Sequence, residues 1–279
     1  MPNLALVRKK NLSSFRRMAL GTWRTAGDPS VYGSMRLRMD EALRYMEEFR
    51  EKKGRKLTIS HMMAKAVAMV LEAMPDANAI LRLGQIYVRK DVAVFFQVSI
   101  EDSETGEIDL SGATVHDANE KSLVEIFDDF QATVDKVRSG KDKELEGARS
   151  LFKTIPFFLI RWVLNLISFL SYTLNLDLRW AGMPRDAFGS VMVTNIGSLG
   201  LESAYVPLVP YSRVPLLLAL GVLRKEPVVI DDAVGIEQIM MVHATFDHRI
   251  LDGSHAATMS KTLREWMEHP YEHFDALEE

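Results

Sequence analysis

The chain has 279 residues, of which 47% are hydrophobic, 9% aromatic and 26% charged, and it contains no cysteine. This composition is typical of a globular protein with a large buried core, and it excludes a disordered chain, a collagen-like repeat and a disulfide scaffold. Without cysteine there can be no thiolate nucleophile, cysteine-ligated zinc or iron–sulfur cluster. The formal charge of −4 leaves no overall basic surface, so no nucleic-acid partner is expected.

The first eighteen residues, MPNLALVRKKNLSSFRRM, are basic but have neither the continuous apolar stretch nor the cleavage site of a secretory signal. We interpret them as a solvated arm, with contact to anionic lipid as the alternative. A chain without signal or cysteine fits a cytoplasmic location.

Spacing of apolar residues predicts the regular elements in chain order. Helices are expected at 40–53 with Gly54 as a stop, at 61–74 with Thr58 or Ser60 as cap and Pro75 as the end, and at 122–138. Strands are expected at 92–100, 190–194, 216–222 and 239–246, with a hairpin turn at Asp231-Asp232. Long helices between separated strands indicate one domain with an α/β or α+β sandwich fold.

Residues 151–180 are unusually apolar, and twenty consecutive residues within them could in principle span a bilayer. Four polar residues fall on one helix face: Arg161, Asn165, Ser168 and Tyr172. A charge at bilayer depth costs at least ~2.5 kcal/mol, so we expect an amphipathic helix with this stripe in water. Three roles stay open: packing on the body or at a subunit interface, in-plane membrane contact, and a flap over an apolar acyl pocket.

The segment TFDHRILDGS, residues 245–254, carries the clearest chemistry. His248 follows an apolar run and precedes an Asp-Gly pair by four residues, and imidazole can take and return a proton near neutrality. We expect Gly253 to permit the tight turn that begins a last helix, from Ser254 to about His269. A structural His–Asp pair at a helix entry is the alternative.

FDHRILDG resembles the His-Arg-x-x-Asp-Gly signature of the acyltransferase (E2) catalytic domain of 2-oxoacid dehydrogenase complexes, a relative of chloramphenicol acetyltransferase. Four more segments resemble that family in the same order: LTISHMMAKAVAMVLEAMPDANAIL, VHDANEKSLVEIF, GSVMVTNIGSLG and LALGVLRKEPVVID. The matches cover most of residues 15–270, apart from an apolar insertion at about 142–186. The resemblance implies an α/β two-layer sandwich, with a mixed β-sheet flanked by helices.

The resemblance also implies roles for individual residues. His248 matches the general base that takes a proton from the attacking thiol or hydroxyl. Thr194 stands where the family usually has serine, whose hydroxyl donates a hydrogen bond to the tetrahedral oxyanion. Asp252 matches a structural aspartate paired with an arginine, for which Arg17 is the first choice and Arg16 the second. Arg17, Gly253 and Asn195 are expected to support the site.

In that family the site lies between the subunits of a trimer, so a homotrimer is expected, with a larger core as an extension. The acyl group would be carried by coenzyme A or a dihydrolipoyl arm, with no metal and no covalently bound cofactor. No lipoyl or peripheral-subunit-binding domain is expected, because only about fifteen residues precede the match, and a lipoyl group would come from a partner in trans. The family's Ile-Pro-His near the N-terminus reads Asp28-Pro29-Ser30 here, which changes a pocket wall.

The expected function is therefore that of a CoA-dependent acyltransferase. The alternative is a catalytically weak assembly or regulatory homologue, associated with a membrane through residues 151–180. Three other histidines receive structural interpretations: His61 as a core histidine, His243 as a packing residue or neighbour of the site, and His255 as a capping or surface residue.

Overall fold

The computed structural model describes residues 2–10, 29–101, 108–138, 156–230 and 232–277. Within them, seven strands form a sheet in the order β2-β10-β8-β7-β5-β6, and β9 pairs with the first half of β10. β7 runs parallel to β5 and β8, whereas the other pairs are antiparallel, so the sheet is mixed. The strands are β2 (Ser30–Arg38), β5 (Ala93–Glu101), β6 (Ile108–His116), β7 (Val191–Asn195), β8 (Leu216–Leu220), β9 (Arg224–Ile230) and β10 (Ala233–Asp247).

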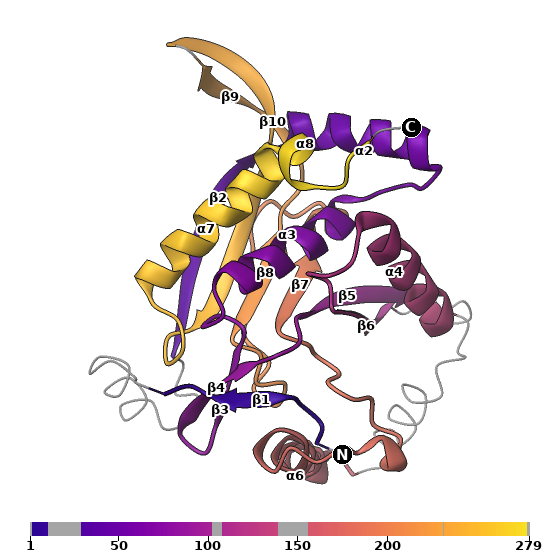
Figure 1. Cartoon of the computed structure of the whole chain (residues 1–279), viewed down its shortest axis with the longest axis vertical. Helices are drawn as coiled ribbons and strands as arrows, with labels where there is room; N and C mark the ends of the chain where they lie inside the picture. Colours follow the sequence, from indigo (N-terminus) through magenta and orange to yellow (C-terminus); the bar gives the residue numbers. More distant parts are fainter. Residues whose placement is uncertain (1, 11–28, 102–107, 139–155, 231, 278–279) are drawn as a thin grey trace.

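Helices cover one face of this sheet, as Figure 1 shows for α3 and α7 in front of β7, β8 and β10. They are α2 (Asp40–Lys53), α3 (Ile59–Ala73), α4 (Leu123–Arg138), α7 (Gly253–Glu268) and the short α8 (Pro270–His273). The predicted helices and strands are confirmed, with β10 longer than expected. Strand β2 was not predicted; its side chains alternate between half-buried and exposed positions because one face of the strand packs against α7.

Local sequence explains where these helices begin and end. Thr58 caps α3. The backbone N–H of Thr58 donates to the His61 ring at 3.1 Å, and the backbone N–H of His61 donates back to Thr58. Gly54 ends α2 in the left-handed conformation with φ of 67°, and its N–H donates to the carbonyl of Arg50. Such a φ is costly for other residues, so Gly54 acts as the predicted stop.

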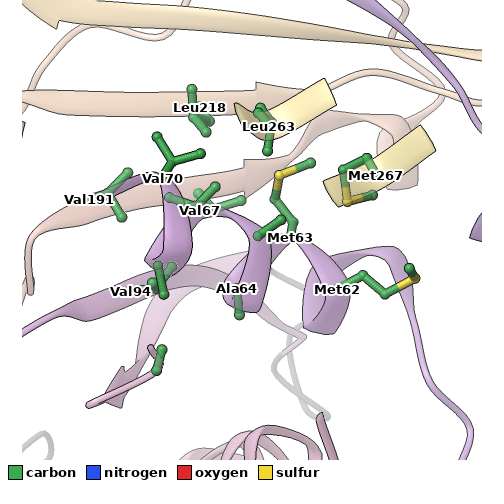
Figure 2. Close-up of a cluster of buried hydrophobic side chains, with 14 of the residues drawn as sticks. Met62, Met63, Ala64, Val67, Val70, Val94, Val191, Leu218, Leu263 and Met267 are labelled. Carbon is green, nitrogen blue, oxygen red and sulfur yellow. The ribbon is translucent and has the colours of Figure 1, made fainter. Parts of the chain in front are cut away.

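The core between the layers is built on α3. Val67 and Val70 of α3 point toward the strands, where Val191 and Leu218 lie, and Met63 points toward α7 (Figure 2). Because strand residues alternate between faces, Met192 and Leu217 lie on the opposite face and pack against the irregular segment around Val206–Val209. Thr194 therefore also belongs to the face away from the helices.

A second, three-stranded sheet holds the N-terminus, in the order β1 (Leu6–Arg8), β4 (Gln85–Arg89) and β3 (Ala79–Arg82). The interpretation of the N-terminal residues as a solvated arm is wrong for the part that the structure describes. β1 pairs with β4, and Leu4 is buried against Ile80 and Tyr172. Apolar contact at Leu4 fixes this segment in place, although its basic residues suggested solvent exposure.

The apolar segment forms helix α6 (Phe157–Ser168), a π-helical turn (Phe169–Thr173) and a 3₁₀ turn (Arg179–Ala181). The expected solvated polar stripe is wrong for two of its four residues, Ser168 and Tyr172, because both are buried. Ser168 accepts a hydrogen bond from Arg213, and Tyr172 packs on the N-terminal segment. No helix in the described ranges is long and apolar enough to cross a bilayer.

Candidate active site

His248 lies immediately after β10, where the chain turns toward α7. The backbone N–H of His248 donates to the carbonyl of Pro29, and its ring Nδ1 lies 2.8 Å from the carbonyl oxygen of Leu251. A carbonyl can only accept, so Nδ1 carries the proton and the lone pair of the neutral ring is on Nε2. The backbone thus holds the imidazole in the tautomer that a general base requires.

The turn around His248 is fixed by an ion pair that the sequence reading missed. Arg249 binds both carboxylate oxygens of the buried Asp247, at 2.6 to 3.1 Å, and its backbone N–H donates to the same carboxylate. The N–H groups of Ile250 and Leu251 donate to the Asp247 carbonyl. The signal in the sequence is the placement of opposite charges on both sides of the histidine.

Asp252 caps α7 and thereby positions the end of the His248 turn. Its carboxylate accepts from the N–H groups of Ser254 and His255, from the Ser254 hydroxyl at 2.6 Å, and lies 2.7 Å from the His255 ring. Burial raises the pKa of Asp252, but the hydrogen bonds from Ser254 and His255 outweigh this effect and hold the pKa well below its usual value. The capping role expected for His255 is confirmed.

The expected arginine partners of Asp252, Arg17 and Arg16, lie outside the described residues. The prediction that Gly253 permits a tight turn is wrong. Gly253 is the first residue of α7, its φ is not positive, and a Cβ added to it would meet nothing within 4 Å. The Asp252 side chain, rather than glycine flexibility, begins the helix.

Thr194 is the next-to-last residue of β7, and its hydroxyl donates to the side-chain oxygen of Gln97 at 3.1 Å. Gln97 comes from the neighbouring strand β5, beside Thr194 in the parallel register. The sequence reading missed Gln97; its signal is one polar amide in the apolar run VAVFFQVSI. If the side-chain amide of Gln97 is flipped, its NH₂ group donates to the Thr194 hydroxyl, and the Thr194 proton becomes available to another acceptor.

Two glycines hold the loop after Thr194 close to the end of β8. A Cβ on Gly197 would lie 2.6 Å from the backbone oxygen of Gly221, and one on Gly221 would lie 2.4 Å from that of Glu202. Asn195 adds a side-chain cap, accepting from the N–H of Ser198 at 3.1 Å. Close backbone approach explains why both the NIGSLG and LALG segments carry glycine at these positions.

The structure does not bring Thr194 and His248 of one chain together. Thr194 pairs with Ala219 of β8, which pairs with His243 of β10, and β10 then continues for four residues to Asp247. With about 3.4 Å per residue and 4.8 Å per strand, the Cα atoms of Thr194 and Asp247 are roughly 16 Å apart. The ends of β7 and β10 that carry the two groups lie at opposite ends of the sheet.

His61 and His243 have structural surroundings. His61 is buried beside Phe127 and Phe130, and burial lowers its pKa to about 4. His243 is buried, packs edge-on against Tyr205 at 5.0 Å between ring centroids, and has Nε2 3.3 Å from the carbonyl of Glu202. In the described part of the chain, no cluster of three histidine or acidic side chains could hold a metal.

An apolar cavity of about 120 Å³ lies between the sheet and the helices. It is lined by β2 residues around Ser34, by Phe246 of β10, and by Ala256, Met259 and Leu263 of α7. Phe246 precedes His248 by two residues, but His248 itself does not line the cavity. No residue of α6 lines it, so α6 does not form a flap over this cavity.

Comparison with known proteins finds relatives of this chain. Residues 8–152 and 186–274 match the model of the 2-oxoacid dehydrogenases acyltransferase catalytic domain. The unmatched stretch, 153–185, is shorter than the insertion expected at about 142–186. A dihydrolipoyllysine-residue acetyltransferase component of the pyruvate dehydrogenase complex from Zymomonas mobilis is 22% identical over 247 residues, 87% of this chain and 45% of the relative. The chain thus spans about half the length of the curated relatives it matches.

Solved structures share the fold. A probable dihydrolipoamide acetyltransferase from Listeria monocytogenes has a TM-score of 0.66 at 18% identity, covering 98% of this chain and 99% of its own. The cubic core of the pyruvate dehydrogenase multienzyme complex has a TM-score of 0.64 at 19% identity, with 95% and 93% covered. Chloramphenicol acetyltransferase has a TM-score of 0.51 at 11% identity, with 94% and 100% covered. The expected two-layer sandwich is confirmed.

Proposed function

Because the chain belongs to the family of 2-oxoacid dehydrogenase acyltransferase catalytic domains, we propose that it transfers an acyl group between coenzyme A and a thiol or hydroxyl acceptor. Dihydrolipoyl is the leading acceptor, since relatives are dihydrolipoyllysine-residue acetyltransferases. The observation that carries the proposal is the contact between His248 Nδ1 and the Leu251 carbonyl, which leaves the lone pair of the neutral ring on Nε2.

The reaction needs one base and one oxyanion donor. Nε2 of His248 takes the proton of the acceptor thiol, and the thiolate attacks the carbonyl carbon of the acyl thioester. The negative oxygen of the tetrahedral intermediate accepts a hydrogen bond from a Thr194 hydroxyl. When the intermediate collapses, the C–S bond to coenzyme A breaks and the proton on His248 passes to the departing sulfur.

The base and the donor come from different subunits in this proposal. Groups that act on one tetrahedral centre must each lie about 3 Å from it, whereas Thr194 and the His248 turn of one chain are roughly 16 Å apart. A cyclic homotrimer would bring the His248 end of one sheet to the Thr194 end of the next. The likeness to a cubic core supports such an assembly, and a larger core is a further extension of it.

The acyl donor and the lipoyl group are not part of this catalytic domain. The acyl-CoA is a diffusible substrate, and a lipoyl group is presented to the site by a separate lipoyl-bearing domain. The composition of the proposed site, a histidine and two hydroxyl or amide side chains, carries out thioester exchange without a metal or a bound prosthetic group.

Acetyl-CoA and dihydrolipoamide test the proposal directly, with release of free CoA as the measured product. We expect His248→Ala to lower kcat by at least about 100-fold. His116→Ala, an exposed histidine at the end of β6, is the matched control and should keep the parent rate. Equal rates for His248→Ala and the parent would reject the assignment of the base, whereas a parent that releases no CoA would favour a role in assembly alone.

A further inference from the structure

Helix α6 and the π-helical turn after it expose several large apolar side chains. In α6, Trp162 is 72% exposed and Leu166 56%, beside the exposed polar residues Arg161 and Asn165, and Phe169 in the turn that follows is 45% exposed. An amphipathic helix packed on a protein normally buries its apolar side. Here, large apolar side chains stay exposed beside polar ones, which is the pattern of a surface that binds a partner or a membrane.

We propose that this surface, called here the α6 face, binds in the plane of an anionic lipid bilayer. It consists of the exposed apolar side chains Trp162, Leu166, Phe169, Leu174, Leu176 and Trp180. Tryptophan and leucine on one side of a helix, with arginine beside them, suit the boundary between lipid headgroups and acyl chains. α6 has 12 residues and is about 18 Å long, which fits a helix lying on a bilayer and not one crossing it.

Charge supports an anionic surface as the occupant. The N-terminal segment is attached to the α6 region, because Asn3 donates to the carbonyl of Asn175 at 2.9 Å and accepts from Arg185 through its own carbonyl. Residues 2–10 and 156–185 together carry six basic side chains and one acidic side chain, although the whole chain has a charge of −4. The basic residues are Arg8, Lys9, Lys10, Arg161, Arg179 and Arg185, and the acidic one is Asp177.

Three of these cations have acidic partners in the described part of the chain: Lys9 pairs with Asp76, Arg179 with Asp177, and Arg185 with Asp91. Arg8, Lys10 and Arg161 are exposed. Basic side chains near an anionic bilayer each favour binding by about 1 kcal/mol, which screening by salt reduces. Attraction to anionic headgroups would therefore act together with apolar insertion of the tryptophans.

The family comparison argues against a second copy of the chain as the occupant. The α6 face lies within residues 153–185, which the family model leaves unmatched. An interface shared with relatives would use matched residues, so the α6 face is an addition to the shared framework. Figure 1 shows α6 at the end of the molecule away from the projecting β9–β10 hairpin, next to β1.

Vesicle flotation of the full chain tests the proposal. We expect binding to phosphatidylcholine vesicles containing phosphatidylglycerol to exceed binding to phosphatidylcholine alone at least about tenfold, and to weaken with salt. Trp162→Glu and Leu166→Glu should each lower binding at least about tenfold. Ile236→Glu, which changes a 74% exposed apolar residue of the β9–β10 hairpin in the same way, should leave binding unchanged.

Two results would overturn the proposal. One is failure of the parent to bind the phosphatidylglycerol vesicles, or equal binding by the parent and Trp162→Glu. The other is a smaller oligomer in lipid-free buffer for Trp162→Glu than for Ile236→Glu, which would show that a second copy covers the α6 face. Retained acyl transfer by Trp162→Glu would separate this outcome from a failure of the proposed function.

Discussion

Two inactive variants should restore each other's activity if the base and the oxyanion donor come from different chains. His248→Ala removes the base, and Thr194→Val removes the hydroxyl while keeping the size of the side chain. We expect each variant alone to lose at least about 100-fold in kcat. In one chain the two groups lie roughly 16 Å apart across β7, β8 and β10, so neither variant damages the other's half-site.

The expected recovery follows from how chains combine in a trimer. An active site in the mixture needs His248 from one chain and Thr194 from its neighbour. With equal, random mixing, about one site in four has both, so the co-expressed variants should reach about a quarter of the parent activity. A site built within one chain would give no recovery at all.

A second mixture serves as the control. Parent chains mixed equally with a His248→Ala/Thr194→Val double variant should also give about a quarter of the activity if sites are shared, but about half if each chain is complete alone. The assay is release of CoA from acetyl-CoA with dihydrolipoamide, and native mass spectrometry verifies hybrid trimers. Hybrid trimers without recovery would refute the shared site.

Three further predictions concern residues around this framework. Gln97→Glu should lower kcat at least about tenfold with little change in KM, because a carboxylate only accepts and would hold the Thr194 proton; an unchanged kcat would contradict this. Gly197→Ala should destabilise the fold by about 1–3 kcal/mol in urea unfolding, since its Cβ would lie 2.6 Å from backbone oxygen; a stability equal to the parent would mean that the loop yields freely. Burial lowers the pKa of His61 from 6.5 in the unfolded chain to about 4 in the folded protein. Its contribution to the unfolding free energy is therefore complete above pH 6.5 and falls by up to about 3 kcal/mol toward pH 4. His61→Asn should flatten that part of the pH profile of the unfolding free energy.

Local sequence determined much of the framework. Apolar spacing with Thr58 and Gly54 at the boundaries defines α3 and the end of α2, because capping and helix termination act within a few residues. The order of motifs also identified the family, and its signature led to His248. These features depend on neighbours along the chain, so they can be recognised without tertiary contacts.

Tertiary structure decided the features that depend on distant partners. β1 and β2 have weak patterns and became strands because β4 and β10 offer them hydrogen bonds. Gln97 reaches Thr194 only through the parallel pairing of β5 with β7, across almost a hundred residues of sequence. The orientation of α6 could not be predicted from the sequence either. Periodicity defines the two sides of a helix, but contacts with distant parts of the chain decide which side is buried.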